Sequence, residues 1–233
     1  MRTIRSLFPL CLIILFLTLS TGFYSCRSKS GQPALPPVAK PEVPEGWTGL
    51  FDGETLHGWE VTNFGPQGEV YVSGGNIILE MGDGCTGITW NGEFPVMDYQ
   101  VELDARIVDG NDFFCGMTFP VNDSFCSLIV GGWGGPVVGL SSIDGVDASD
   151  NETYMLKRFE RGTWYHIRLK VSPGKIEAWI DDEQVIDFNT EGRALSIRPE
   201  VDLSRPFGIC SWKTTSSLRN IRVKLPAEQS PEA

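Results

Sequence analysis

Two segments of this chain alternate strictly between apolar and polar residues, and this pattern restricts the fold more than any other feature. In YQVELDARI (99–107) every second residue is apolar, and TWYHIRLKV (163–171) shows the same alternation from Tyr165 onward. A period of two residues puts alternate side chains on opposite faces of a β-strand. Each segment is therefore predicted to be a strand with one face in a core and one polar face.

Shorter runs of the same kind occupy most of the middle of the chain. They are EVYVSGGNIILEM (69–81, two strands around Gly74-Gly75), KIEAWID (175–181), EQVIDF (183–188) and LRNIRVKL (218–225). Only residues 146–160 suggest helix, and there a single turn. Many short strands separated by turns predict an all-β fold, an antiparallel β-sandwich. The run from Trp164 to Phe188 resembles the jelly-roll sandwiches of the concanavalin A-like and laminin G type.

The two ends of the chain differ from this middle in composition. Residues 1–25 place two Arg before the apolar run LFPLCLIILFLTL, which is typical of a secretory signal. The signal ends in Ser25-Cys26, a pattern similar to a lipobox, so lipid attachment at Cys26 is predicted, with plain secretion as the alternative. Residues 26–45 are a Pro-rich tether, 46–225 one domain, and 226–233 a loose tail. We expect an exported protein at the cell envelope.

The charge of the chain limits its partners. It has 19 Lys and Arg against 30 Asp and Glu, a formal net charge of -11. So acidic a protein repels nucleic acid and anionic lipid head groups. Nucleic acid is excluded as a partner, and any membrane attachment is expected through the lipid alone. The sequence does not determine the oligomeric state.

Four cysteines lie within the predicted domain, namely Cys85, Cys115, Cys126 and Cys210. Their spacing is not that of a zinc site. Cys115 and Cys126 flank a predicted turn, so a disulfide across a hairpin is one possibility, although buried free thiols are the preferred interpretation. An acidic loop at 141–152 lacks the spacing of an EF-hand, so no metal is assigned and calcium stays an alternative there.

The segment Phe51 to Trp59, FDGETLHGW, matches the motif Phe-Asn/Asp-Gly-x-x-Leu-x-Gly-Trp. Further matches follow at Asp98–Leu103, Gly162–Val171 and Asn220–Val223. With these motifs the chain resembles the 3-keto-disaccharide hydrolase domain family over nearly the whole predicted domain. The resemblance implies a sandwich fold and cleavage of a 3-keto-glycoside. In that reaction a base removes the C2 proton, the group on C1 leaves, and water adds.

One strand pair departs from the family pattern. Where family members have an Arg, this chain has Pro120, and the family's Glu and Gln positions between Ser124 and Val130 are small or apolar. The resemblance to the family therefore supports the fold of this chain more strongly than its catalytic mechanism. A non-catalytic carbohydrate-binding envelope lipoprotein is the alternative, and a purely structural lipoprotein is the third hypothesis.

The polar faces of the two alternating strands supply the predicted catalytic residues, Glu102, Asp104 and His166. A row of carboxylates can provide a base, and a histidine transfers protons near neutral pH. Arg106 and Arg168 lie on the same faces and are predicted to bind substrate. The alternative is that both faces are simply solvated.

Two tryptophans in other segments are predicted to bind sugar. Trp133 stands among four glycines in LIVGGWGGPVVGL (128–140), and Trp212 is followed by Lys213 in GICSWKTT. Aromatic faces pack against the C–H faces of pyranoses, so Trp133, Trp212 and Lys213 are taken as substrate-binding residues. The alternative is that each Trp only packs at the rim of the domain. The glycines lack phosphate-loop or dinucleotide spacing, and no cofactor is predicted.

Overall fold

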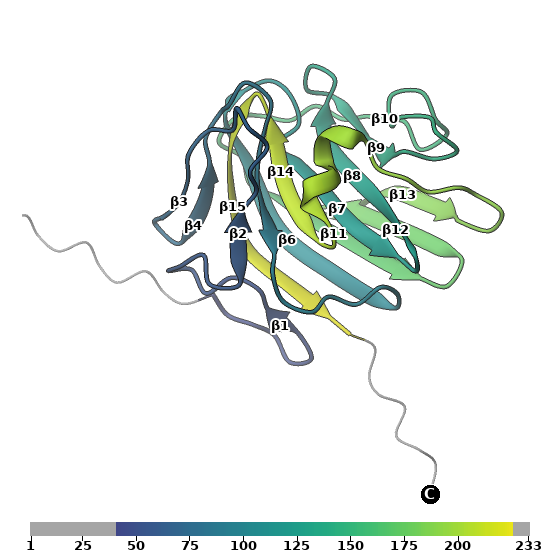
Figure 1. Ribbon diagram of the computed structural model, residues 1–233, viewed down its shortest axis with the longest axis horizontal. Helices are drawn as coiled ribbons and strands as arrows, with labels where there is room; N and C mark the ends of the chain where they lie inside the picture. The colour runs from purple at the N-terminus through teal and green to yellow at the C-terminus, as the bar shows by residue number, and fades with distance from the viewer. Residues whose placement is uncertain (1–40, 226–233) are drawn as a thin grey trace, which may run out of the picture. The chain divides into compact units, whose positions relative to one another are not determined.

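The computed structural model describes residues 41–225, and this part of the chain is built almost entirely from β-strands (Figure 1). Two antiparallel sheets face each other, so the predicted β-sandwich is confirmed. The predicted signal (1–25), the lipid site Cys26, most of the tether and the tail (226–233) lie outside the described residues. Between residues 41 and 225, no helix is long and apolar enough to cross a membrane.

Sheet A has eight strands, and sheet B has seven. The order in sheet A is β13 (Glu183–Asn189), β12 (Lys175–Ile180), β11 (Tyr165–Ser172), β6 (Tyr99–Gly110), β15 (Thr214–Lys224), β4 (Asn76–Leu79) and β3 (Val70–Ser73), with β1 (Thr48–Gly49) also paired to β15. The order in sheet B is β10 (Met155–Leu156), β9 (Val137–Ser141), β8 (Ser124–Gly132), β7 (Cys115–Val121), β14 (Gly208–Trp212), β5 (Cys85–Trp90) and β2 (Trp59–Val61). A short 3-10 helix, η1 (Pro199–Ser204), packs against β5 and β14.

The core lies between the sheets and follows the predicted alternation. Val101, Leu103 and Ala105 of β6 and Ile167 and Leu169 of β11 point inward and are completely buried. The same cluster contains inward side chains of sheet B, including Met117, Phe119, Leu128, Val130 and Leu140. Burying one such side chain stabilises the fold by about 1.5–3 kcal/mol. The polar residues between them are therefore held on the outer face of sheet A.

The motif at Phe51 to Trp59 has a structural role. Phe51 and Trp59 are buried, and the indole N–H of Trp59 donates to the carbonyl of Leu50 at 2.7 Å. Gly58 has a left-handed φ of 81°, and a Cβ atom there would lie 2.5 Å from the Trp90 ring. Only glycine fits such a position without strain. The motif closes one end of the sandwich.

Asp52 holds the turn inside this motif. Its Oδ1 accepts the N–H groups of Thr55 at 2.7 Å and Glu54 at 2.8 Å, and its Oδ2 accepts the Thr55 hydroxyl. These hydrogen bonds, led by the Thr55 N–H, lower the pKa of Asp52 to about 2. The carboxylate is thus committed to the turn and not to a ligand.

Two local expectations are resolved by the structure. The segment 146–160 forms no helix, but it contains one turn in which the N–H of Asn151 donates to the carbonyl of Asp147 at 3.1 Å, followed by the short strand β10. The β7–β8 hairpin forms, but its register pairs Cys115 with Val130 and Cys126 with Phe119, so the two sulfurs are not opposed. The preferred interpretation of buried free thiols is confirmed for all four cysteines of the domain.

Candidate functional site

The three predicted catalytic residues lie together on the outer face of sheet A. Neighbouring β6 and β11 bring them into one cluster, because His166 is paired with Asp104 and Arg168 with Glu102. The Nδ1 of His166 lies 2.9 Å from Oδ1 of Asp104, and its Nε2 lies 3.8 Å from Oε2 of Glu102. The structure brings these groups together, while their catalytic role stays a prediction.

Residues of β15 complete this cluster as an ion-pair network. Oδ2 of Asp104 accepts from Nε of Arg219 at 3.1 Å and from Nδ2 of Asn220 at 2.8 Å. Nε and Nη2 of Arg222 donate to Oε2 of Glu102 at 3.0 and 2.7 Å. Burial raises the pKa of Asp104, but hydrogen bonds from His166, Asn220 and Arg219 outweigh it and leave the pKa below its usual range. A carboxylate so well paired is a weak base.

The two arginines predicted to bind substrate also lie on this face, each over a tryptophan ring. Cζ of Arg106 is 4.5 Å from the centroid of Trp164, and Cζ of Arg168 is 5.2 Å from that of Trp179. These are cation–π distances. The indole faces are thus covered by guanidinium groups of the protein itself.

The outer face of sheet B has a different composition. Glycines occupy many of its outward positions, among them Gly87, Gly116, Gly139 and Gly208. A Cβ atom at Gly208 would lie 2.7 Å from Ser204 of η1, and one at Gly139 would lie 3.0 Å from Ala148. Because the strands carry no side chains here, η1 and the loop after β9 pack directly on the sheet. They cover part of it and leave a hollow beside them.

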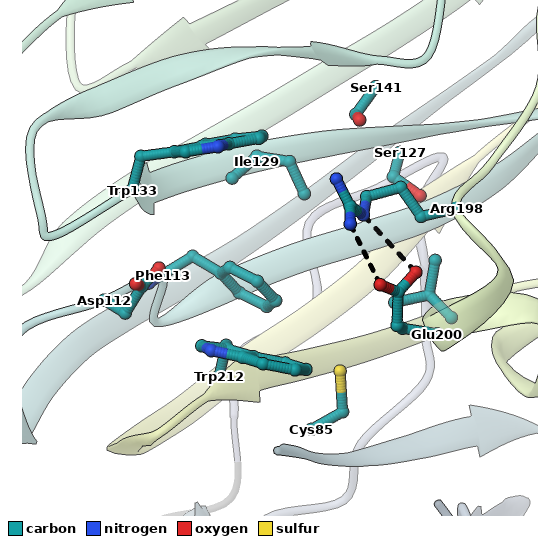
Figure 2. A pocket seen from close by; sticks show the side chains of 11 residues that line it. Cys85, Asp112, Phe113, Ser127, Ile129, Trp133, Ser141, Arg198, Glu200 and Trp212 are labelled. Atoms are coloured by element: carbon teal, nitrogen blue, oxygen red, sulfur yellow. Dashed lines mark hydrogen bonds and ion pairs between the residues drawn. The ribbon is translucent and has the colours of Figure 1, made fainter. Parts of the chain in front are cut away.

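This hollow is a pocket of about 220 Å³. Its lining includes the aromatic residues Phe113, Trp133 and Trp212 and the polar residues Asp112, Ser127, Ser141, Arg198 and Glu200. Figure 2 shows the two indole rings nearly edge-on at opposite sides, with Phe113 between them. The structure therefore brings Trp133 and Trp212 together from hairpins that are far apart in sequence, as a single binding site requires.

The position of Trp133 depends on Asp112. Trp133 sits at the tip of the β8–β9 hairpin with a left-handed φ of 49°, and its side chain is 41 % exposed. Oδ2 of Asp112 accepts the N–H of Gly134 at 3.2 Å, while Oδ1 accepts the N–H of Phe113 at 2.8 Å. One carboxylate thus links the turn that carries Trp133 to the strand that follows Phe113.

Sequence reasoning missed the charged pair of this pocket, Arg198 and Glu200. Nη2 of Arg198 donates to Oε1 of Glu200 at 2.9 Å (Figure 2), and Nη1 donates to Asp147. Asp147 in turn accepts the hydroxyls of Ser141 at 3.1 Å and Ser142 at 2.9 Å. The hydrogen bond from Arg198 lowers the pKa of Glu200. Because this segment shows no strand periodicity, its packing on sheet B could not be foreseen.

Lys213 does not line the pocket. Its Nζ lies 2.9 Å from Oδ1 of Asp83, and both side chains are exposed. The structure therefore separates Lys213 from its neighbour Trp212, and its role in substrate binding stays a prediction.

The acidic loop at 141–152 is neutralised by arginines. Nε of Arg193 lies 2.7 Å from Oδ2 of Asp144 and also contacts Glu152 through Nη1, while Arg198 pairs with Asp147. Within residues 41–225, no group of three or more His, Cys, Asp or Glu side chains is arranged to hold a metal ion. The loop thus contributes to the pocket through Asp147 and Arg198.

The sequence over residues 46–224 matches the model of the 3-keto-alpha-glucoside-1,2-lyase-like domain. The chain belongs to this family. The expected resemblance to the 3-keto-disaccharide hydrolase domain is confirmed by this match, which covers the whole sandwich. No match was found among curated protein sequences.

Solved structures with the same sandwich as this 3-keto-alpha-glucoside-1,2-lyase-like domain are distant in sequence. A glycosyl hydrolase candidate from Parabacteroides distasonis ATCC 8503 has a TM-score of 0.52 and 15 % identity, covering 80 % of this chain and 99 % of that one. The Crh5 transglycosylase in complex with NAG has a TM-score of 0.55 and 14 % identity, covering 82 % and 88 %. At such identities the comparison shows the fold alone.

The departures from the family pattern fall on the outer face of sheet B. Pro120, where the family pattern leads us to expect an Arg, lies on β7 two residues after Thr118. The hydroxyls of Thr118 and Ser127 are 2.9 Å apart. Ser127 and Ile129, from the altered strand β8, line the pocket. In this 3-keto-alpha-glucoside-1,2-lyase-like domain β7 and β8 carry no charged side chains. The charged groups near them come from Arg198 and Glu200.

Proposed function

We propose that the pocket on sheet B binds a sugar and that the protein cleaves 3-keto-glycosides there. The observation that carries this proposal is the meeting of Trp133, Trp212 and the Arg198–Glu200 pair in one pocket of a 3-keto-alpha-glucoside-1,2-lyase-like domain. The distant sandwiches described as a glycosyl hydrolase candidate and as a transglycosylase bound to NAG agree with a carbohydrate ligand.

The pocket has the chemistry of a sugar site. Indole faces pack on the apolar C–H faces of a pyranose, and the polar groups around them satisfy its hydroxyls. Ser127, Glu200 and Arg198 offer a hydroxyl, a carboxylate and a guanidinium on one wall. The volume of about 220 Å³ lies below the range usual for drug-sized ligands and suits a single sugar ring.

The proposed reaction uses the acidity that the 3-ketone gives to the C2 proton. Glu200 takes this proton, and Arg198 donates to the ketone oxygen as negative charge develops on it. The enolate electrons then form the C1–C2 double bond, and the bond from C1 to the leaving oxygen breaks. Water protonates the leaving oxygen, the resulting hydroxide adds to C1, and Glu200 returns its proton to C2.

A second candidate function is sugar binding without cleavage. Arg198 lowers the pKa of Glu200, which weakens it as a base, and β7 and β8 lack the charged groups of the family pattern. Both observations favour a carbohydrate-binding protein built on the same sandwich. The Glu102, Asp104 and His166 cluster of sheet A remains a rival catalytic site for the first function.

One experiment separates these possibilities. The purified protein is incubated with 3-keto-trehalose and 3-keto-glucosides, and release of the sugar or aglycone is measured together with the ultraviolet absorbance of the enone. We expect Glu200→Gln to abolish release, while Glu102→Gln and His166→Ala retain it. If only Glu102→Gln and His166→Ala fail to release sugar or aglycone, the catalytic site lies on the outer face of sheet A. Saturable binding with no release from any substrate would establish the second candidate function.

We also propose export to the cell envelope with a lipid on Cys26. The apolar segment and the Ser25-Cys26 pair of the sequence support it. Metabolic labelling with a radioactive fatty acid should mark the protein and fail to mark Cys26→Ser. Labelling of that variant would contradict the proposal.

A further inference from the structure

The outer face of sheet A holds a second pocket, built from residues other than those of the sheet B pocket. Its volume is about 300 Å³. Its lining consists of Pro41, Gly74, Gly75, Asn76, Arg106, Trp164, Arg219 and Asn220. The β3–β4 turn, β6 and β15 thus contribute, together with the residue before β11. No carboxylate belongs to this lining, although the chain as a whole has a net charge of -11.

Arg106 is not neutralised in this pocket. Of the described carboxylates, none forms an ion pair with it, and its Nε is buried with no hydrogen-bond partner. A buried polar group without a partner lowers the stability of the fold, and does so more when the group is charged. Neither the core nor the ion-pair network of sheet A accounts for this cost.

The guanidinium groups of Arg106 and Arg219 both pack on the ring of Trp164. Cζ of Arg219 lies 4.0 Å from the centroid of Trp164, and Cζ of Arg106 lies 4.5 Å from it. Two guanidinium groups on one ring repel each other unless negative charge lies nearby. The carboxylate of Asp104 accepts a hydrogen bond from Nε of Arg219 and balances its charge. The same carboxylate also hydrogen-bonds with His166 and Asn220. One positive charge is left over.

The backbone of β15 is shaped for this arrangement. Its pairing with β6 shifts register between Arg219 and Arg222, and Asn220 has a left-handed φ of 55°. A bulge of this kind turns side chains of adjacent residues to one face of the sheet. Arg219 and Asn220 consequently both reach the pocket, where regular alternation would separate them.

We propose that this pocket binds an oxyanion, either the carboxylate of an acidic sugar or a sulfate or phosphate group. The planar guanidinium of Arg106 offers paired N–H donors that match two oxygens of such a group. A bound oxyanion would give the buried Nε of Arg106 its missing partner. The site is separate from the sheet B pocket, and it does not depend on cleavage of a 3-keto-glycoside.

Calorimetric titration of the purified protein at low ionic strength tests this site with four probes: glucuronate, sulfate, phosphate and methyl glucoside. We expect saturable binding of at least one anion and none of methyl glucoside at this pocket. Arg106→Gln should weaken anion binding at least tenfold. Arg106→Lys should weaken it less, because the charge is kept and the fork of donors is lost. Preference for glucuronate over sulfate and phosphate would identify an acidic sugar as the ligand, and the reverse would identify a tetrahedral anion.

Two matched variants control the titration. Arg158→Gln removes the same charge from an exposed residue outside this pocket, and Trp133→Ala alters only the sheet B pocket. Both should bind the anion as tightly as the parent protein. The proposal is overturned if no anion binds, if Arg106→Gln and Arg106→Lys bind like the parent, or if Arg158→Gln weakens binding equally. Near-ultraviolet circular dichroism verifies that each variant is folded.

Discussion

The two outer faces of this sandwich differ in the side chains that their strands carry and in what covers them. Sheet A carries long charged side chains that pair across strands, such as Glu102 with Arg222 and Asp104 with His166. Sheet B carries glycines and small residues, and other segments of the chain cover part of them. On sheet A charged side chains occupy the face itself and line the pocket at Arg106, whereas on sheet B the glycines leave room for η1 and for the pocket that contains Trp133 and Trp212. Conspicuous polar residues therefore do not by themselves mark the site.

The largest loss of stability is expected when a larger side chain replaces a glycine on the outer face of sheet B. In Gly208→Val the new side chain meets Ser204, whose atoms lie 2.7 Å from the position of a Cβ, so η1 must move. Overpacking of this kind costs about 1–3 kcal/mol. We expect a loss of that size in the free energy of unfolding measured with urea. Gln100→Val, at an outward position of β6, is the control and should change it by less than about 0.5 kcal/mol. Equal losses in both variants would refute the contrast between the faces.

Substitution of single tryptophans should show which outer face of the sandwich binds the sugar. Trp212→Ala and Trp133→Ala each remove an indole from the sheet B pocket, and a stacked ring is worth about 1.4 kcal/mol, or tenfold in affinity. Titration with a non-cleavable analogue of a 3-keto-glycoside should show this loss. Trp179→Ala, which removes an indole from the outer face of sheet A, should bind normally. A tenfold loss in that control would instead point to sheet A.

Asp104→Asn should affect stability and leave sugar binding at sheet B unchanged. It weakens the bonds to His166, Arg219 and Asn220, and we expect a loss of about 1 kcal/mol at pH 7. Because the pKa of Asp104 is lowered in the folded protein, its stabilisation is full above about pH 4 and is lost as the pH falls through the folded pKa. Urea denaturation from pH 7 to pH 3 should therefore show a weaker pH dependence in the variant. An unchanged dependence would exclude this role.

The smallest effect is expected at Lys213. Its ammonium pairs with Asp83 and does not line the pocket, so Lys213→Gln should change sugar affinity by less than about twofold, as is usual for exposed ion pairs. The same analogue titration measures it. A loss as large as that of Trp212→Ala would show that Lys213 reaches the ligand after all.

The candidate site could be predicted only in part, and the reasons differ by residue. Trp133 and Trp212 were predicted because indole faces pack on pyranoses, and the structure places both in one pocket, while sugar binding there stays a prediction. Arg198 and Glu200 carry no such signal, since a charged segment between strands is ordinary in sequence. Glu102, Asp104 and His166 were predicted from the polar faces of two strands, but periodicity does not show that these strands are neighbours or which of their residues line a pocket.

The sequence by itself determined most strands of sheet A, their inward faces and the family. Apolar alternation fixes which side of a strand is buried, and turn residues fix where strands end, so these features depend on neighbours in the chain. The tertiary structure alone decided that β7, β8 and β14 share a sheet with an almost bare outer face. It also decided that η1 packs on that face and that a bulge in β15 places Arg219 with Arg106 of β6 on the ring of Trp164. Such features arise from contacts between residues far apart in the chain, and local periodicity does not encode them.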